Sequence, residues 1–199
     1  MTTTTIVFDK DNINDVNLNG LNEYIDWSTN TKKYFNLKAG EEHYRLLAWL
    51  STQVHSKTLV DIGTFNGFSA LALSQDDRKK VVSYDIFDYI PDEIYTAKYK
   101  PNIELRLTDC TDELEVLLDT DLIFIDIDNQ GGQESIILNL LEKYKYKGLV
   151  VLDDINLTKY MTDLWNGIKQ EKYDLTQYGH WSGTGLVNFD PSRFKIVLE

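Results

Sequence analysis

The chain has 199 residues, of which 42% are hydrophobic and 26% are charged, which suits one globular domain with a full hydrophobic core. Its net charge of −12 argues against nonspecific binding to the phosphates of nucleic acids. The only cysteine, Cys110, cannot form an internal disulfide, and no apolar run is long enough for a membrane span, so we expect a cytoplasmic protein without a membrane partner.

Residues 1–40 are polar and rich in asparagine. They predict an N-terminal extension with one short helix at most, which either covers the sheet or forms a lid over a site. Residues 41–199 then form the main domain. A helix is expected from Glu41, because side chains suited to a buried face recur at helical spacing, namely at His43, Leu46, Leu47, Leu50 and Val54.

Short apolar strands then alternate with helices. The expected strands are Thr58–Ile62, Lys80–Tyr84, Ile103–Leu107, Leu122–Ile125 and Gly148–Leu152. The expected helices are Phe68–Ser74, Glu113–Leu118, Glu134–Tyr144 and Met161–Gln170, with a loop or weak helix at Pro91–Lys100. Apolar strands that alternate with helices are typical of a parallel sheet covered on both faces.

The tail of the chain follows a different pattern. Tyr173–Gly179 and Thr184–Phe189 predict two strands joined by a short turn at His180–Gly183, which indicates an antiparallel hairpin at the sheet edge. Phe194–Leu198 is either one more strand or a packed tail. We therefore predict an α/β fold: a Rossmann-like, doubly wound, mostly parallel seven-stranded sheet with a C-terminal antiparallel hairpin.

Acidic residues follow most of the expected strands. In open α/β sheets, ligands bind beyond the carboxyl ends of the strands. Carboxylates gathered there repel one another, so they indicate a cationic or hydroxyl-rich ligand or a metal ion. The residues concerned are Asp61, Asp85, Asp109, Asp126, Asp128, Asp153 and Asp154.

The segment Val60–Ser69 joins a strand to a helix through two glycines, Gly63 and Gly67. Their G-x-x-x-G spacing differs from the G-x-G-x-x-G of dinucleotide-binding folds, and an ordinary glycine turn is the alternative. Asp85 stands where a carboxylate accepts hydrogen bonds from ribose hydroxyls, and Asp109 stands where a carboxylate can accept one from an adenine amino group. Each of these aspartates taken alone could instead cap a helix.

Several segments resemble the class I S-adenosylmethionine-dependent methyltransferases, and more narrowly the small O-methyltransferases of the catechol and caffeoyl-coenzyme A kind. The similarity runs from about Ala39 to Ile155 and rests on Ala39–Glu42, Asp61–Ser69, Tyr84–Asp85, Ile125–Asp128 and Leu152–Ile155. The resemblance implies S-adenosylmethionine as the cofactor, at or near the residues Asp61, Gly63, Thr64, Phe65, Gly67, Ser69, Asp85, Ile86, Asp109, Cys110, Asp126 and Asp128.

In the metal-dependent branch of this family, matching positions hold a divalent cation. The resemblance places Asp126, Asp153 and Asp154 there, and such oxygen ligands suit Mg²⁺, or Mn²⁺ or Ca²⁺. This chain departs from the usual Asp–Asn pair by having Asp153–Asp154, and it has Asn129 where relatives often have His or Lys. The alternative is that Asp153 or Asp154 caps the following helix.

Two catalytic residues are expected. A cation at Asp126 would lower the pKa of an acceptor hydroxyl. Without a metal, a general base is needed, and His180 is the candidate. The alternative is that His180 and Trp181 only pack at the sheet edge, and His43 is expected to be a packing residue.

The function expected is methyl transfer from S-adenosylmethionine to a small-molecule acceptor, with oxygen as the favoured atom. One alternative is a non-catalytic module that binds an adenosyl ligand. Another is an NAD-type Rossmann oxidoreductase, against which the absent G-x-G-x-x-G counts. The sequence names no acceptor and fixes no oligomeric state, although a homodimer is compatible with it.

Overall fold

A seven-stranded sheet forms the centre of the protein in a computed structural model that describes residues 3–24, 33–89 and 100–199. Its strand order is β4-β3-β2-β5-β6-β8-β7, and β8 is the strand that runs antiparallel to its neighbours. This arrangement confirms the predicted fold class. The strands are β2 (Thr58–Ile62), β3 (Lys80–Asp85), β4 (Ile103–Leu107), β5 (Leu122–Ile125), β6 (Leu149–Leu152), β7 (Glu171–Asp174) and β8 (Gly185–Asn188).

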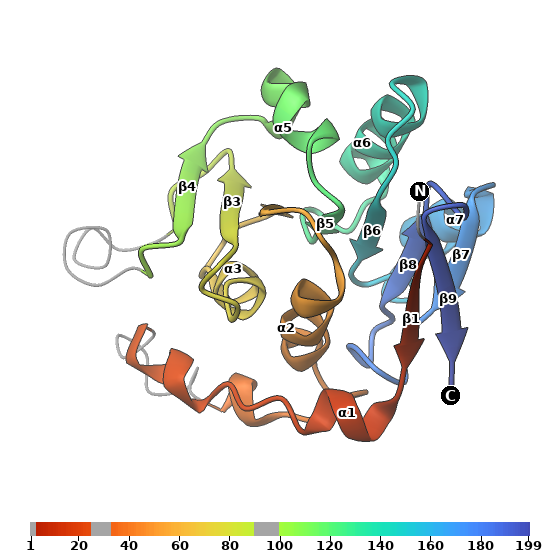
Figure 1. Ribbon diagram of the computed structural model, residues 1–199. Helices are drawn as coiled ribbons and strands as arrows, with labels where there is room; N and C mark the ends of the chain where they lie inside the picture. Colours follow the sequence, from red (N-terminus) through yellow and green to blue (C-terminus); the bar gives the residue numbers. More distant parts are fainter. Residues whose placement is uncertain (1–2, 25–32, 90–99) are drawn as a thin grey trace.

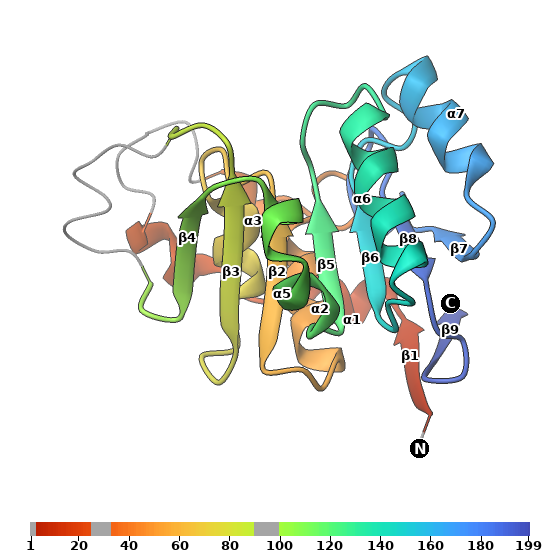
Figure 2. The ribbon, with the colours of Figure 1, turned by 90° about the horizontal axis from the view of Figure 1, so that it is seen from above.

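Helices cover both faces of the sheet (Figure 2). One face carries α1 (Lys10–Asn14), α2 (Tyr44–Gln53) and α3 (Phe68–Leu73); the other carries α5 (Leu114–Leu118), α6 (Gly132–Lys143) and α7 (Lys159–Gly167). Short 3-10 helices lie at Asn19–Tyr24, Tyr34–Asn36 and Cys110–Glu113. The loop or weak helix predicted at Pro91–Lys100 lies outside the described residues except for Lys100. Among the helices in the described ranges, none has the length and apolar character of a membrane span.

The alternation of side chains along each strand builds two cores. In β2, Leu59 packs into the core beneath α2, while Val60 packs into the core beneath α6. Strands buried on both faces read as continuous apolar runs, which is why β5 and β6 could be predicted from their composition. The sheet is therefore held rigidly between two helix layers, and its strand ends form a fixed platform.

A second, two-stranded sheet was not predicted. β1 (Thr4–Phe8) pairs in parallel with β9 (Phe194–Leu198), so both ends of the chain lie side by side (Figure 1). Ile6 and Phe8 of β1 are fully buried in the main core. β1 is short and begins among threonines, so its apolar alternation is too brief to stand out from the polar N-terminus.

The hairpin at the sheet edge is present, but its strands are shorter than predicted. The strand expected at Tyr173–Gly179 ends at Asp174, whose carboxylate accepts a hydrogen bond from the Thr176 amide at 2.9 Å. Such a bond turns the chain out of the extended conformation. A loop of residues 175–184 therefore joins β7 to β8, in place of the predicted four-residue turn, and this loop carries His180 to the strand ends.

Candidate active site

A cavity of about 650 Å³ opens beyond the carboxyl ends of β2, β3, β4 and β5. This volume lies within the range of about 300–1,000 Å³ that is usual for sites of small ligands and cofactors. The described residues that line it are Ile62, Gly63, Phe65, Tyr84, Asp85, Ile86, Phe87, Tyr89, Thr108, Asp109, Cys110, Thr111, Asp126, Ile127, Asp128, Gln133 and Ile137.

Gly63 lets the loop after β2 cross directly against the end of β5. Its φ is +101°, and a Cβ atom there would lie 1.7 Å from the carbonyl oxygen of Asp126. No side chain fits at that distance, so the glycine is required by this close approach. The crossing brings the glycine loop and Asp126 to the same wall of the cavity.

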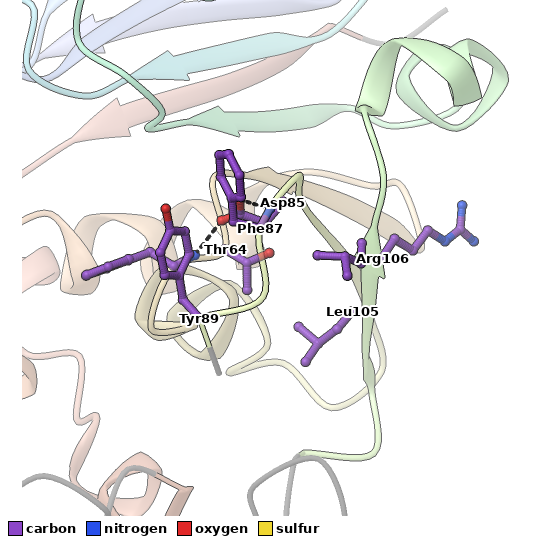
Figure 3. A pocket seen from close by; sticks show the side chains of 8 residues that line it. Thr64, Asp85, Phe87, Tyr89, Leu105 and Arg106 are labelled. Carbon is purple, nitrogen blue, oxygen red and sulfur yellow. Dashed lines mark hydrogen bonds between the residues drawn. The ribbon is translucent and has the colours of Figure 1, made fainter. Parts of the chain in front are cut away.

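Asp85, at the end of β3, fastens the loops around the cavity. Its Oδ2 accepts a hydrogen bond from the Phe65 amide at 2.9 Å, and its Oδ1 accepts one from the Phe87 amide at 3.0 Å (Figure 3). Phe65 has a φ of +41° and is exposed, and its ring lies 5.2 Å from the Tyr89 ring. The carboxylate that was predicted to meet a ribose thus also fixes the aromatic residues at the mouth of the cavity.

Asp109 both lines the cavity and caps a helix. Its Oδ1 accepts hydrogen bonds from the Thr111 amide at 2.8 Å and the Thr111 hydroxyl at 2.7 Å, at the start of the 3-10 helix. The predicted ligand contact and the predicted helix cap are therefore compatible at this residue. Cys110 beside it is buried, and burial followed by the charge of Asp109 raises the pKa of its thiol to about 12.

Asp61 lies beneath the glycine loop and is not among the residues that line the cavity. It is fully buried, and the Ser83 hydroxyl donates to its Oδ2 while contacting the Thr64 hydroxyl at 2.7 Å. Burial raises the pKa of Asp61 to about 6, although hydrogen bonds from Ser83 and Ser69 oppose the shift. Asp61 and Ser69 thus support the loop from below.

A second group of polar side chains lies beyond β5 and β6, and we call it the imidazole–carboxylate cluster. Three main-chain hydrogen bonds assemble it from distant segments. The Gly40 amide donates to Gly179 O at 2.9 Å, so the residues before α2 reach the 175–184 loop. The amides of Ile155 and Asn156 donate to Gly183 O and Ser182 O. The cluster consists of Glu42, His43, Asp126, Asp153, Asp154 and His180.

Asp153 is the centre of this cluster. Its Oδ2 lies 3.3 Å from His43 Nδ1 and 3.4 Å from His180 Nδ1. His43 Nδ1 also lies 3.0 Å from Glu42 Oε1, and His180 Nδ1 lies 3.5 Å from Asp154 Oδ1. His43 packs against the Phe124 ring as predicted, with 4.9 Å between ring centres, but its contact with Asp153 was not foreseen.

The charges in the cluster act strongly on one another. Burial lowers the pKa of His43, but the carboxylates of Asp153 and Glu42 outweigh it and raise that pKa to about 9. Burial likewise opposes the charge on Asp153, yet His43 and His180 hold its pKa below the ordinary value. For Asp126, burial and then the charge of Asp153 raise the pKa to about 7.

The predicted metal ligands are all in or beside this cluster, but not as one set of carboxylates. Among the described residues, the donor groups that come within 4.8 Å of one another are His43 with Asp126 and Asp153, and Asp153 with Asp154 and His180. A third group joins Glu42 to both histidines. Every one of these groups contains an imidazole. The Ser182 hydroxyl also donates to Asp154 Oδ1, so that carboxylate is partly engaged.

The structure thus separates the predicted site residues into three places: the cavity wall, the glycine loop with the residues beneath it, and the imidazole–carboxylate cluster. Those at the cavity wall are Gly63, Phe65, Asp85, Ile86, Asp109, Cys110, Asp126 and Asp128. Thr64 borders a small hollow beside the cavity, and Gly67, Ser69 and Asp61 lie below the loop. Asp126 alone belongs to both the cavity wall and the cluster. The residues that the sequence analysis missed include Phe87 and Tyr89, whose signal was an exposed aromatic pair just after an acidic strand end.

Comparisons with known proteins show which family model and which solved structures this chain resembles. Residues 60–155 match the family model of a methyltransferase domain. A search of curated proteins found no match. The fold resembles a Podospora anserina methyltransferase solved with S-adenosylhomocysteine (15% identity, 84% of this chain and 86% of that one, TM-score 0.56).

Two O-methyltransferases have similar structures. One, from Bacillus cereus and solved with S-adenosylhomocysteine, is 16% identical over 84% of this chain and 90% of that one, with a TM-score of 0.54. The other, TomG from Streptomyces achromogenes, was solved with S-adenosylmethionine and is 17% identical over 74% of this chain and 79% of that one, with a TM-score of 0.51. The family match and the fold confirm the predicted resemblance to the class I methyltransferases.

Proposed function

We propose that this protein, whose residues 60–155 match a methyltransferase domain, transfers a methyl group from S-adenosylmethionine to a hydroxyl oxygen of a small molecule. The observation that carries the proposal is the cavity of about 650 Å³, which is lined by Asp85 and Asp109 at the ends of two adjacent strands and by Asp126 beyond β5. Structures of similar fold with bound S-adenosylmethionine or S-adenosylhomocysteine support the choice of cofactor.

In this proposal, the two halves of the cofactor contact different strand ends. Asp85 accepts hydrogen bonds from the ribose hydroxyls, and Asp109 accepts one from the adenine amino group, with Cys110 and Ile137 as apolar walls. The methionine part lies along Gly63, where the absent side chain leaves room for a close approach to the main chain. Asp126, whose main chain lies against Gly63, would then be next to the methionine part of the cofactor.

Methyl transfer is an in-line displacement. The acceptor oxygen forms a bond to the methyl carbon, the carbon–sulfur electron pair stays on sulfur to give S-adenosylhomocysteine, and the hydroxyl proton leaves to a base. Asp126 is the residue we assign to accept that proton, because it is the one cluster member that lines the cavity among the described residues. His180 contacts Asp153 and Asp154, so we assign it a positioning role.

A divalent cation is compatible with the same region. Two buried side-chain atoms of the imidazole–carboxylate cluster, His43 Nδ1 and Asp153 Oδ1, have no hydrogen-bond partner among the described residues. A cation bound there would polarise an acceptor hydroxyl and lower its pKa. The residues that would hold it are Asp153 and its neighbours His43, Asp126, Asp154 and His180.

One observation favours a second candidate, an adenosyl-binding module without catalysis. Among the described residues that line the cavity, Asp126 is the only member of the cluster, and neither Asp153 nor His180 is included. A cavity that ends at Asp126 would hold the cofactor without providing a wall for an acceptor. The experiment below separates the two candidates.

The test is methyl transfer from S-adenosylmethionine with a labelled methyl group to a panel of catechols, phenols and aliphatic alcohols. We expect label in at least one hydroxyl acceptor and a loss of at least tenfold in rate for Asp126→Asn. The matched control is Asp119→Asn, since Asp119 is exposed at the end of α5 and lies outside the cavity wall. Binding of S-adenosylhomocysteine with no transfer to any acceptor would favour the second candidate, and no binding would contradict both.

A further inference from the structure

We propose that the rings of Phe65, Phe87 and Tyr89, which we call the aromatic rim, bind the methyl acceptor, and that this acceptor is an apolar molecule without negative charge. The inference rests on the proposed function and deepens it, because it names the class of acceptor and the side chains that contact it. It also departs from the caffeoyl-coenzyme A part of the resemblance, since a coenzyme A thioester carries several phosphate charges.

The first support is the exposure of the aromatic rim. Its three side chains are between 50% and 60% exposed, and all three line the cavity. The Tyr89 ring lies 5.2 Å from the Phe65 ring and 6.0 Å from the Phe87 ring, centre to centre. Leu107 of β4 is also exposed and borders the hollow beside them, where Figure 3 shows Phe87 and Tyr89. Single exposed apolar side chains are common, but a contiguous group of them marks a binding surface.

The second support is that the main chain holds the aromatic rim in place. One carboxylate, that of Asp85, accepts hydrogen bonds from the amides of both Phe65 and Phe87. Phe65 has a φ of +41°, a left-handed conformation that is strained for a residue other than glycine. Such strain persists only where the surrounding structure enforces it, and it is concentrated at binding and catalytic sites. The aromatic rim is therefore a preformed surface.

The position of the aromatic rim indicates the acceptor as its occupant. The methionine part of the cofactor is proposed to lie along Gly63, and Phe65 follows Gly63 by two residues. Two residues of chain span at most about 7 Å, so an acceptor at the methyl group lies within reach of the Phe65 ring. The cofactor contacts proposed above use other residues of the cavity wall and leave the exposed faces of the three rings for a second molecule.

The charges of the cavity wall disfavour an anionic acceptor. Among the described residues that line the cavity, none is a lysine, arginine or histidine, and the charged ones are Asp85, Asp109, Asp126 and Asp128. Arg106 borders the adjoining hollow, but it is paired with Glu104 and Glu113. Proteins bind phosphates and carboxylates mainly through charge-assisted hydrogen bonds from cations. We therefore expect acceptors that carry a carboxylate or phosphate to bind weakly.

The test is calorimetric titration of the protein saturated with S-adenosylhomocysteine, using three probes that share one catechol group: catechol, 4-tert-butylcatechol and 3,4-dihydroxybenzoate. We expect 4-tert-butylcatechol to bind at least about tenfold more tightly than catechol, because its alkyl group is buried against the rings, and 3,4-dihydroxybenzoate to bind more weakly than catechol. Phe87→Ala and Tyr89→Ala should each weaken the binding of 4-tert-butylcatechol at least about fivefold.

Tyr144→Ala is the matched control, because Tyr144 is an exposed aromatic residue at the end of α6 and is not among the described residues that line the cavity. It should bind all three probes as wild type does. Equal affinities for catechol and 4-tert-butylcatechol, tighter binding of 3,4-dihydroxybenzoate, unchanged affinities in both rim variants, or no binding of any probe would each overturn the inference.

The same probes are then tested as acceptors of labelled methyl groups from S-adenosylmethionine. Binding of 4-tert-butylcatechol that depends on the aromatic rim, without methyl transfer to it or to any other acceptor, would support the binding site and contradict the proposed catalysis. Failure of this inference and failure of the proposed function are therefore distinguishable.

Discussion

Two groups of carboxylates lie at neighbouring strand ends, and they are held in different ways. Asp85 and Asp109, beyond β3 and β4, accept hydrogen bonds from amides two residues ahead or from the nearby glycine loop. Asp153, beyond β6, is buried against His43 and His180, which lie 110 and 27 residues away in the sequence. The first group faces an open cavity, and the second is enclosed by charged partners.

The two environments suit the two groups of carboxylates to different partners. A carboxylate that is fixed by its own loop and exposed to a cavity can accept hydrogen bonds from a neutral ligand without rearrangement. A carboxylate that is buried needs a cation beside it, because an unpaired buried charge is strongly unfavourable. The cavity half is therefore suited to the cofactor and the cluster half to a cation, and Asp126 lies where they meet.

Gly63→Ala should disturb both halves at once and give the largest effect. The new Cβ would overlap the Asp126 carbonyl, and the φ of +101° is unfavourable for alanine. We expect a loss of more than about 4 kcal/mol in the free energy of unfolding, or no folded protein. Gly132→Ala is the control, because a Cβ there meets nothing within 4 Å, and it should change stability by less than about 0.5 kcal/mol in denaturant titrations. Equal stabilities for the two variants would contradict the close approach of Gly63 to the Asp126 carbonyl.

Asp61→Asn should change how the free energy of unfolding depends on pH. The pKa of Asp61 is raised to about 6 from 3.8, so the folded protein holds a proton there that the unfolded chain releases. Stability contributed by that proton is lost as the pH rises from about 4 to 6. Relative to wild type, Asp61→Asn should gain about 3 kcal/mol between pH 4 and pH 8. Denaturant titrations across this range that run parallel for the two proteins would contradict the assignment.

Asp85→Ala should separate the two halves. Loss of a carboxylate that accepts two ligand hydroxyls should weaken S-adenosylhomocysteine binding by about 2 kcal/mol, close to thirtyfold, in calorimetry. Asp119→Ala should leave the affinity for S-adenosylhomocysteine as in wild type. If Asp85→Ala binds the adenosyl ligand normally, the ribose assignment is wrong.

The smallest effect is expected at Cys110. Because burial raises the pKa of its thiol to about 12, iodoacetamide at pH 8 should modify it slowly in the folded protein and rapidly in denaturant. Cys110 lines the cavity, so saturating S-adenosylhomocysteine should slow the modification of the native protein by a further few-fold. Mass spectrometry follows the reaction, and a rate that the ligand does not change would place Cys110 away from the adenine.

The cavity half could be predicted from sequence because its information is local. The strand ending in Asp85 and the glycines at Gly63 and Gly67 are each visible within ten residues, and parallel strands bring their ends to one edge of the sheet. The cluster half could not be predicted from sequence, because its residues come from distant segments. The contact between His43 and Asp153 depends on the Gly40–Gly179 hydrogen bond and on a loop that begins with the turn at Asp174.

The N-terminal strand was missed for a similar reason. Ile6 and Phe8 become core residues only because β9, at the other end of the chain, pairs with β1. β9 was expected as a strand or a packed tail, but nothing in its residues indicates that β1 is its partner. Whether residues 1–40 also serve as a lid stays a prediction.

The most direct test of the central claim is calorimetric titration of the purified protein with S-adenosylhomocysteine and S-adenosylmethionine, with NAD as the control ligand. The account predicts one adenosyl site per chain, with dissociation constants on the order of micromolar, and no heat from NAD. A folded sample that binds neither adenosyl ligand, or that binds NAD as tightly, would contradict the assignment of the cavity.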